Sequence, residues 1–231
     1  MRLNRYLALC GLGSRRAVED FIRFGRIKVN GEIAGLATAV LETDRVELDG
    51  KPIHKPEEHA YYLFNKPIGY VCSRGDTHGR ETVYDLLPPD LQSLHYVGRL
   101  DMDSRGLLFF TDDGELTARL THPSHEVLRV YRVYTVDRLS EQDMEDLREG
   151  VEVEPGVILK CAEIESMPDG YRLCLREGKK REIRRLLQAL GHRVTDLQRV
   201  AFGGVELGTL PEGKFRKLTL KEIELLRETF Q

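Results

Sequence analysis

Two acidic side chains precede an apolar segment within a glycine-flanked stretch of the chain, an unusual place for carboxylates. Residues 97–114 read VGRLDMDSRGLLFFTDDG, with Asp101 and Asp103 between Gly98 and Gly106. Because glycine lets a backbone turn tightly, both carboxylates can stand at the mouth of the apolar strand predicted after them. There a carboxylate can act as a nucleophile, or it can only close hydrogen bonds of the turn.

The neighbouring carboxylates leave other interpretations open. Asp112 and Asp113 precede Gly114, so we interpret them as a turn or a helix cap. Asp103 can be a partner that steadies the Asp101 loop. A glycosidase-like hydrolase built on the Asp101 and Asp103 pair is a further alternative, because such enzymes use two carboxylates.

A carboxylate that must stay ionised in a closed pocket needs a cation beside it, since burial favours the neutral acid. The segment EGKKREIRRLLQALGHRV predicts a helix whose buried face is formed by Ile183, Leu186, Leu187 and Leu190. At 100° per residue, Arg184 lies just beside this apolar stripe, closer to the interior than Arg181 or Arg185. The periodicity therefore predicts that Arg184 reaches Asp101.

Three separated motifs of the chain resemble one enzyme family. They are NKPIG at residues 65–69 followed by Val71-Cys72-Ser73, GRLDMDSRGLL at residues 98–108, and EGKKREIRR at residues 177–185. Together they resemble the RsuA-type ribosomal RNA pseudouridine synthases, in which the Asp of GRLD is the catalytic carboxylate. The third motif is similar to the family pattern EGRNRQVRRM, whose Arg after the Val or Ile pairs with that Asp.

The resemblance implies roles for particular residues. Asp101 is the implied catalytic carboxylate and Arg184 its cation. Tyr131 matches the Tyr of a KxYxV pattern, seen here as RVYRV, and the flat ring of a Tyr suits contact with a flipped base. Arg129 replaces the Lys of that pattern, which keeps the charge and changes its geometry. Arg99 is expected to steady the RNA as the nucleotide leaves its stack.

The first fifty residues predict a small basic domain. They predict helices over residues 2–10 and from Ser14 to about Phe24, then short strands joined by a hairpin turn at Asn30-Gly31. This arrangement resembles the RNA-binding domain named after ribosomal protein S-four. By that resemblance, the contacts with RNA phosphates are Arg2, Arg5, Arg15, Arg16, Arg23 and Lys28.

Charge is distributed unevenly along the chain. The formal net charge is −3, yet residues 1–30 hold seven basic and two acidic residues, and residues 176–199 hold eight basic and three acidic ones. If nucleic acid is the partner, local patches must supply the attraction. In the second patch we expect Lys179, Lys180 and Arg181 to contact RNA.

The order of motifs predicts an α+β protein with two domains. Residues 1–50 form the RNA-binding domain, and residues 51–59 read as a linker because they are polar, hold two prolines and lack periodicity. The resemblance implies that residues 60–231 form a pseudouridine synthase domain with a mixed, mainly antiparallel sheet flanked by helices. Capping boxes are predicted where Ser140 and Thr219 precede helices.

Composition limits the remaining possibilities. With 231 residues and 41% hydrophobic content, the chain can bury a real core. No apolar run reaches the length of a membrane span and no signal-like segment is evident, so we expect a cytoplasmic monomer. The four cysteines are far apart, and the histidines, including His95, His122, His125 and His192, are scattered. We therefore expect no disulfide framework and no metal site.

The expected activity is the isomerisation of uridine to pseudouridine in ribosomal RNA, which involves no redox change and thus no cofactor. The sequence context leans slightly toward the large ribosomal subunit. The alternative is a protein that binds ribosomal RNA or assists ribosome assembly without chemistry.

Overall fold

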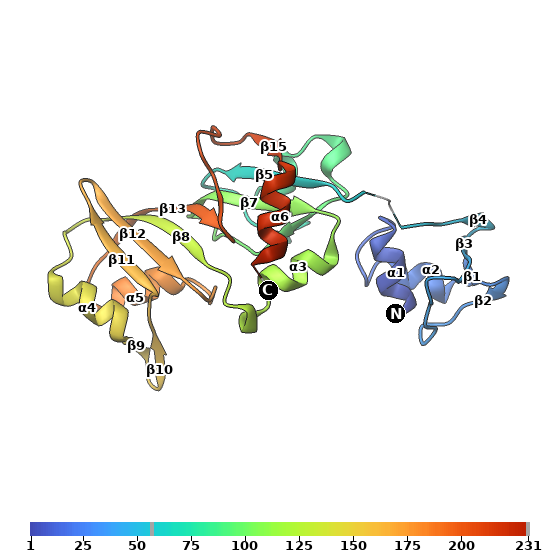
Figure 1. The fold of residues 1–231 in the computed structure, drawn as a ribbon, viewed down its shortest axis with the longest axis horizontal. Coiled ribbons are helices and arrows are strands. Elements are labelled where there is room, and N and C mark those ends of the chain that lie inside the picture. The colour runs from blue at the N-terminus through green and yellow to red at the C-terminus, as the bar shows by residue number, and fades with distance from the viewer. Residues whose placement is uncertain (56–57, 230–231) are drawn as a thin grey trace. The chain divides into compact units, whose positions relative to one another are not determined.

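The computed structural model describes residues 1–55 and 58–229, and it divides into two compact units (Figure 1). The first unit comprises Met1–Ala60 together with Ser93–His95 and Asp112–Gly114, and the second comprises the other described residues from Tyr61 on. None of the helices in the described ranges combines the length and the apolar character that a membrane span requires.

The first unit packs two helices against a small antiparallel sheet. The helices are α1 (Leu3–Leu9) and α2 (Val18–Arg23), and the sheet order is β2 (Glu32–Ile33), β1 (Ile27–Val29), β3 (Val46–Leu48) and β4 (Lys51–Pro52). Leu3, Leu7, Ile22, Ile27 and Val46 are among the buried residues of its core. The second helix begins later than predicted, because residues after Ser14 form turns before Val18.

Two tight turns shape this sheet. Asn30 (φ 53°) and Gly31 (φ 88°) connect the paired residues Val29 and Glu32, which confirms the predicted hairpin turn. Asp49-Gly50 makes a similar turn, with φ of 52° and 77°, and carries Lys51–Pro52 back along β3. The start of the predicted linker therefore belongs to the sheet, while Pro56 and Glu57 of that linker lie outside the described residues.

The second unit is built on one mixed, mainly antiparallel sheet, as predicted. Its strand order is β11-β12-β8-β13-β7-β5-β15, with β14 on β13 and β6 on β7, and the β13–β7 pair is parallel. The bounds are β5 (Tyr61–Lys66), β6 (His95–Val97), β7 (Arg105–Thr111), β8 (Arg129–Thr135), β11 (Glu163–Met167), β12 (Gly170–Leu175), β13 (Val194–Phe202), β14 (Val205–Glu206) and β15 (Phe215–Lys217).

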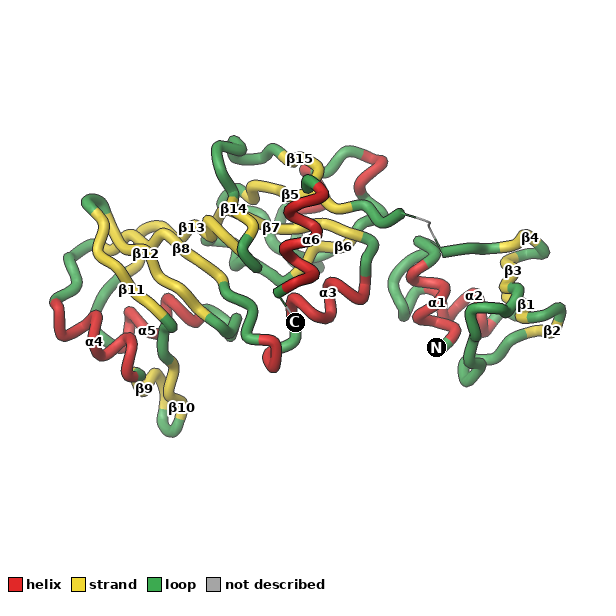
Figure 2. The backbone as a smooth tube through the Cα atoms, viewed as in Figure 1, coloured by secondary structure: helices red, strands yellow, loops and turns green. Residues whose placement is uncertain are grey.

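Helices cover the two halves of this sheet with separate cores (Figure 2). On the half with β8, β12 and β13, α4 (Glu141–Glu149) and α5 (Glu182–Ala189) contribute buried residues. On the half with β5 and β7, α3 (Gly114–Thr121) and α6 (Leu220–Glu228) do so. The shorter elements are the hairpin β9 (Val151–Glu154) and β10 (Val157–Leu159), and the 3-10 helices η1 (Val83–Leu86), η2 (Pro89–Leu91) and η3 (Pro123–His125).

Local sequence signals set several helix ends in this unit. Ser140 and Thr219 cap α4 and α6 through complete capping boxes, as predicted. In α5 the predicted apolar face is confirmed, because Ile183, Leu186 and Leu187 are buried. Arg181 precedes this helix in a left-handed conformation, with φ of 52°.

The two halves of the sheet meet at Gly106. Arg199 of β13 pairs with Gly106 of β7 in parallel register, and Gly106 has a φ of 108°. A Cβ atom at Gly106 would lie 2.3 Å from the Arg199 carbonyl oxygen, so only glycine fits here. This close approach brings the carboxylate-bearing loop before β7 against the middle of the sheet.

Candidate active site

A cavity of about 380 Å³ lies where the 98–104 loop, β8 and the segment before α5 meet. It is lined by six of the residues that the sequence singles out as catalytic or RNA-binding, namely Arg99, Asp101, Tyr131, Lys179, Lys180 and Arg181. These residues come from segments that lie up to 82 positions apart in the sequence. The fold thus gathers the predicted site residues of the second unit other than Arg184 around one cavity.

Lys66, at the end of β5, holds the loop that carries Asp101 in place through hydrogen bonds to its main chain. Lys66 is fully buried, and its Nζ donates hydrogen bonds to the carbonyl oxygens of Asp101 (3.1 Å), Ser104 (2.8 Å) and Pro67 (3.0 Å). Burial lowers the pKa of Lys66, because desolvation disfavours its charged form. A charged donor to three carbonyl oxygens fixes the turn and so fixes where the Asp101 side chain begins.

Two further buried cations, Arg199 and Arg129, donate hydrogen bonds to the main chain around the cavity. Arg199 is 1% exposed, and its guanidinium donates to the carbonyl oxygens of Leu107 (2.8 Å) and Arg99 (3.4 Å). Arg129 is also buried and donates to the carbonyl oxygens of Val127 (2.7 Å) and Leu120 (3.1 Å). Among the described residues, neither these arginines nor Lys66 makes an ion pair with a carboxylate. All three cations therefore act on the main chain.

The cation nearest the Asp101 carboxylate is Arg181, which corrects the prediction that Arg184 pairs with it. Arg181 Nη1 lies 4.0 Å from Asp101 Oδ2, whereas the contacts of Arg184 go to Asp103 and to the Val194 carbonyl oxygen. The prediction failed because the rule of 100° per residue applies only inside a helix. Arg181 stands just before α5 in a left-handed conformation, so its side chain leaves the backbone in another direction.

Asp103 lies within a cluster of two arginines. Arg181 donates to both of its carboxylate oxygens (2.9 and 3.1 Å), and Arg184 contacts Oδ2 at 3.2 Å and donates to the Asp103 carbonyl oxygen (2.7 Å). Burial pushes the pKa of Asp103 upward, but the Arg181 hydrogen bonds and the Arg184 charge outweigh it and hold that pKa below its usual value. Asp103 is thus poorly suited to donate a proton as the second carboxylate of a glycosidase.

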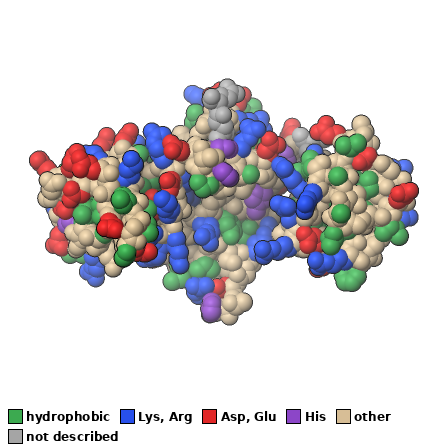
Figure 3. All heavy atoms as spheres, turned by 90° about the horizontal axis from the view of Figure 1, so that it is seen from below, with side chains coloured by type: hydrophobic (Ala, Val, Ile, Leu, Met, Phe, Trp, Pro, Cys, Tyr) green, Lys and Arg blue, Asp and Glu red, His purple; other side chains and the backbone are tan. Residues whose placement is uncertain are grey.

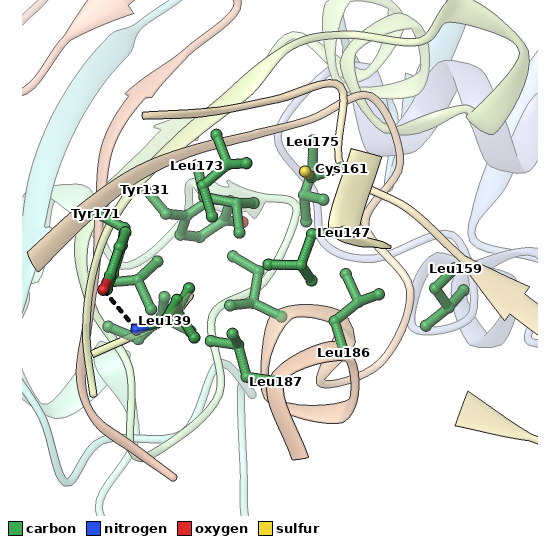
Figure 4. Packing of buried hydrophobic residues seen from close by; sticks show 14 of the residues in the cluster. Tyr131, Leu139, Leu147, Leu159, Cys161, Tyr171, Leu173, Leu175, Leu186 and Leu187 are labelled. Atoms are coloured by element: carbon green, nitrogen blue, oxygen red, sulfur yellow. Dashed lines mark hydrogen bonds between the residues drawn. The ribbon is translucent and has the colours of Figure 1, made fainter. Parts of the chain in front are cut away.

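Tyr131 serves both the core and the cavity. It lies in β8 between Leu173 of β12 and Arg199 of β13, and it is 8% exposed. Figure 4 shows its ring beside Leu173 within the hydrophobic cluster. The same side chain lines the cavity that Asp101 lines. Sheet packing therefore fixes an aromatic ring in the cavity wall.

The start of α5 and the segment before it combine exposed cations with one buried acid. Lys179, Lys180 and Arg181 are exposed, whereas Glu182 is 5% exposed and accepts a hydrogen bond from the Lys179 backbone N–H (2.9 Å). Burial raises the pKa of Glu182 above its ordinary value. The cavity mouth is therefore positively charged, although its wall includes this one buried carboxyl.

The RNA contacts predicted in the first unit are all at its surface. They are Arg2, Arg5, Arg15, Arg16, Arg23 and Lys28, each of them exposed. Arg23 is partly neutralised, because it pairs with Glu19 and Asp20. Phosphate contact by these residues stays a prediction.

Sequence reasoning missed the buried cations. Lys66 lies in the NKPIG motif and Arg199 in the second basic patch, but lysine and arginine are usually exposed, and neither spacing indicates burial.

Across the described ranges, no group of three or more His, Cys, Asp or Glu side chains is arranged to hold a metal ion.

Comparisons with known proteins agree with this arrangement. Residues 60–189 match the RNA pseudouridylate synthase family, and residues 1–46 match the S4 domain. A crystal structure of a pseudouridylate synthase superposes with a TM-score of 0.72 at 32% identity, covering 98% of this chain and 99% of that one.

Three curated relatives each align with 98% of the chain. Ribosomal large subunit pseudouridine synthase B of Pseudomonas aeruginosa is 40% identical, and the chain spans 62% of its length. The protein of the same name from Escherichia coli (strain K12) is also 40% identical, with 82% of its length covered. An uncharacterized RNA pseudouridine synthase of Aquifex aeolicus is 36% identical, with 93% covered.

Proposed function

Because the chain belongs to the RNA pseudouridylate synthase family, we propose that it isomerises uridine to pseudouridine in ribosomal RNA. Relatives named for the large ribosomal subunit favour that subunit as the source of the substrate. The observation that carries the proposal is the cavity that brings Asp101, Tyr131 and Arg181 together at a basic surface. A protein that only binds RNA has no need of an oriented carboxylate and an aromatic wall in one cavity.

The chemistry assigned to this cavity rearranges bonds within one nucleotide. The bond from C1′ to N1 breaks, a bond from C1′ to C5 forms, the hydrogen on C5 leaves as a proton, and N1 gains a proton. The Asp101 carboxylate attacks or triggers the departure of the base, and Arg181, with Nη1 4.0 Å from Asp101 Oδ2, is the cation beside it. The electrons balance without an oxidant or reductant, so the reaction requires no redox cofactor.

The target uridine must leave its stack to reach Asp101, because Asp101 lines a cavity that a stacked base cannot enter. The Tyr131 ring offers a flat apolar wall for the flipped uracil, and the exposed Arg99, Lys179 and Lys180 can hold the flanking phosphates. Surface arginines and lysines of the first unit add contacts that position RNA without reading its sequence.

Loss of the hydrogen from C5 gives a direct test. Ribosomal RNA transcribed with uridine that carries tritium at C5 should release tritium with the native chain, and Asp101→Asn should bind the RNA without releasing any. Retained release by Asp101→Asn would overturn the role of Asp101. An unchanged pseudouridine map in ribosomal RNA from a strain lacking this protein would instead favour the alternative, a binding protein without chemistry.

A further inference from the structure

A second hollow adjoins the cavity at the far side of Arg181. It has a volume of about 490 Å³ and is lined by Arg181, Arg184, Gln188, Gly191, His192, Arg193 and Val194. Arg181 lines both spaces, so the hollow continues the surface of the cavity along α5. A strand whose nucleotide occupies the cavity can therefore run into this hollow.

The hollow is positively charged. Within the described part of the chain, three arginines line it and no carboxylate does. Asp103 and Asp143 contact lining residues and have partners of their own, because Asp103 is held by Arg181 and Arg184, and Asp143 contacts Ser140 and His192 (3.2 Å). Figure 3 shows Lys and Arg side chains interspersed with Asp and Glu on one face of the molecule.

Arg193 is the lining arginine whose donors are free. Its side chain is exposed and makes no hydrogen bond or ion pair with any described residue, whereas Arg181 and Arg184 hold Asp103. The backbone of Arg193 is fixed, because its carbonyl oxygen accepts a hydrogen bond from the Val136 N–H (3.1 Å). Gln188 adds an exposed amide beside it. A fixed backbone with a free guanidinium suits an anionic ligand.

We propose that this hollow binds a backbone phosphate of the substrate RNA, outside the nucleotide that enters the cavity, with Arg193 as its main contact. The inference rests on the proposed function for the identity of the ligand. RNA is favoured over other anions because the hollow shares Arg181 with the cavity that would hold the target nucleotide. Contacts to phosphate position the strand and do not read its sequence.

The salt dependence of RNA binding tests this assignment. Affinity for an unmodified transcript of bacterial large-subunit ribosomal RNA is measured by fluorescence anisotropy from about 50 to about 200 mM salt. Arg193→Ala should weaken binding about threefold to tenfold and reduce the slope of log affinity against log salt by about 0.7 to 0.9, the value for one lost phosphate contact. Arg193→Lys should restore most of the slope, since phosphate accepts a point charge.

Arg132→Ala is the matched control. Arg132 is exposed on β8, one residue beyond Tyr131 and thus on the opposite face of the sheet. Its loss should leave the salt slope unchanged. A slope for Arg193→Ala equal to that of Arg132→Ala would overturn the proposal, as would full binding by Arg193→Glu. RNA binding is measured independently of catalysis, so the two proposals can fail separately. If binding depends on Arg193 but the native chain releases no tritium, the proposed function is refuted and this inference stands.

Discussion

The buried cations beneath the cavity and the exposed cations around its mouth contact different partners. Lys66, Arg129 and Arg199 donate to carbonyl oxygens of the main chain. Arg181 faces carboxylates, and Lys180 faces solvent. The buried set fixes where the loop lies, whereas the exposed set lies at the surface, where charge on the substrate can reach it. Lysine and arginine therefore hold the main chain in place where they are buried, and they form a charged surface where they are exposed.

The largest effect is expected for Lys66→Met, which removes a buried cation while keeping a similar volume. Three carbonyl oxygens would lose their hydrogen-bond donor, which destabilises the fold, while the cost of burying the Lys66 charge would disappear. The first effect should be larger, so the free energy of unfolding should fall by about 2 kcal/mol. A displaced Asp101 should lower the tritium-release rate about 100-fold.

Urea unfolding and tritium release measure these two quantities, with Lys160→Met as an exposed control that should stay within about 0.5 kcal/mol of the native chain. If Lys66→Met matched the control in both measurements, the distinction between buried and exposed cations would fail.

A comparison of Arg181→Gln with Arg184→Gln should give an intermediate effect. Arg181 is the cation nearest Asp101, so its loss should lower the single-turnover rate at saturating RNA about tenfold or more. Arg184 contacts Asp103 and backbone carbonyl oxygens, so its loss should lower the rate less and reduce the free energy of unfolding by about 1 kcal/mol. The reverse order of rates would restore the sequence-based pairing of Arg184 with Asp101.

The smallest effect concerns Glu182, the buried acid among the cations. Its pKa is raised in the folded chain, so ionisation costs folding free energy once the pH exceeds the unfolded value, and the cost is absent at low pH where both states are protonated. Glu182→Gln keeps an acceptor for the Lys179 N–H. It should raise the free energy of unfolding by about 1 kcal/mol at pH 8 and leave it unchanged at about pH 3.

Urea unfolding at the two pH values measures this difference. A variant that is less stable than the native chain at pH 8 would show that the charged form of Glu182 has a stabilising partner.

The features that sequence predicted correctly are local ones. Asn30-Gly31 forms its hairpin turn, and Ser140 and Thr219 cap their helices, because each signal acts over two or three residues. The grouping of Asp101 and Tyr131 in one cavity came from the family resemblance, since no local rule joins a loop to a strand thirty residues away.

The features that sequence missed depend on tertiary contacts. Lys66 is buried because the loop before β7 folds over it, and that contact joins residues 35 to 38 positions apart. Arg181 faces Asp101 because its left-handed backbone lies outside the helix that periodicity describes. Neither secondary-structure propensity nor helical spacing predicts the burial of Lys66 or the position of Arg181.

The parallel pairing at Gly106 also bears on how the chain folds. It joins β7 to β13, whose paired residues are 93 positions apart, whereas the β11–β12 hairpin pairs residues as close in sequence as Met167 and Gly170. Closing so long a loop costs conformational entropy, and this cost precedes the favourable contacts between β7 and β13. We therefore expect the β11–β12 hairpin to form early and the Asp101 loop to order only when β7 and β13 pair, so that catalytic competence is acquired late in folding.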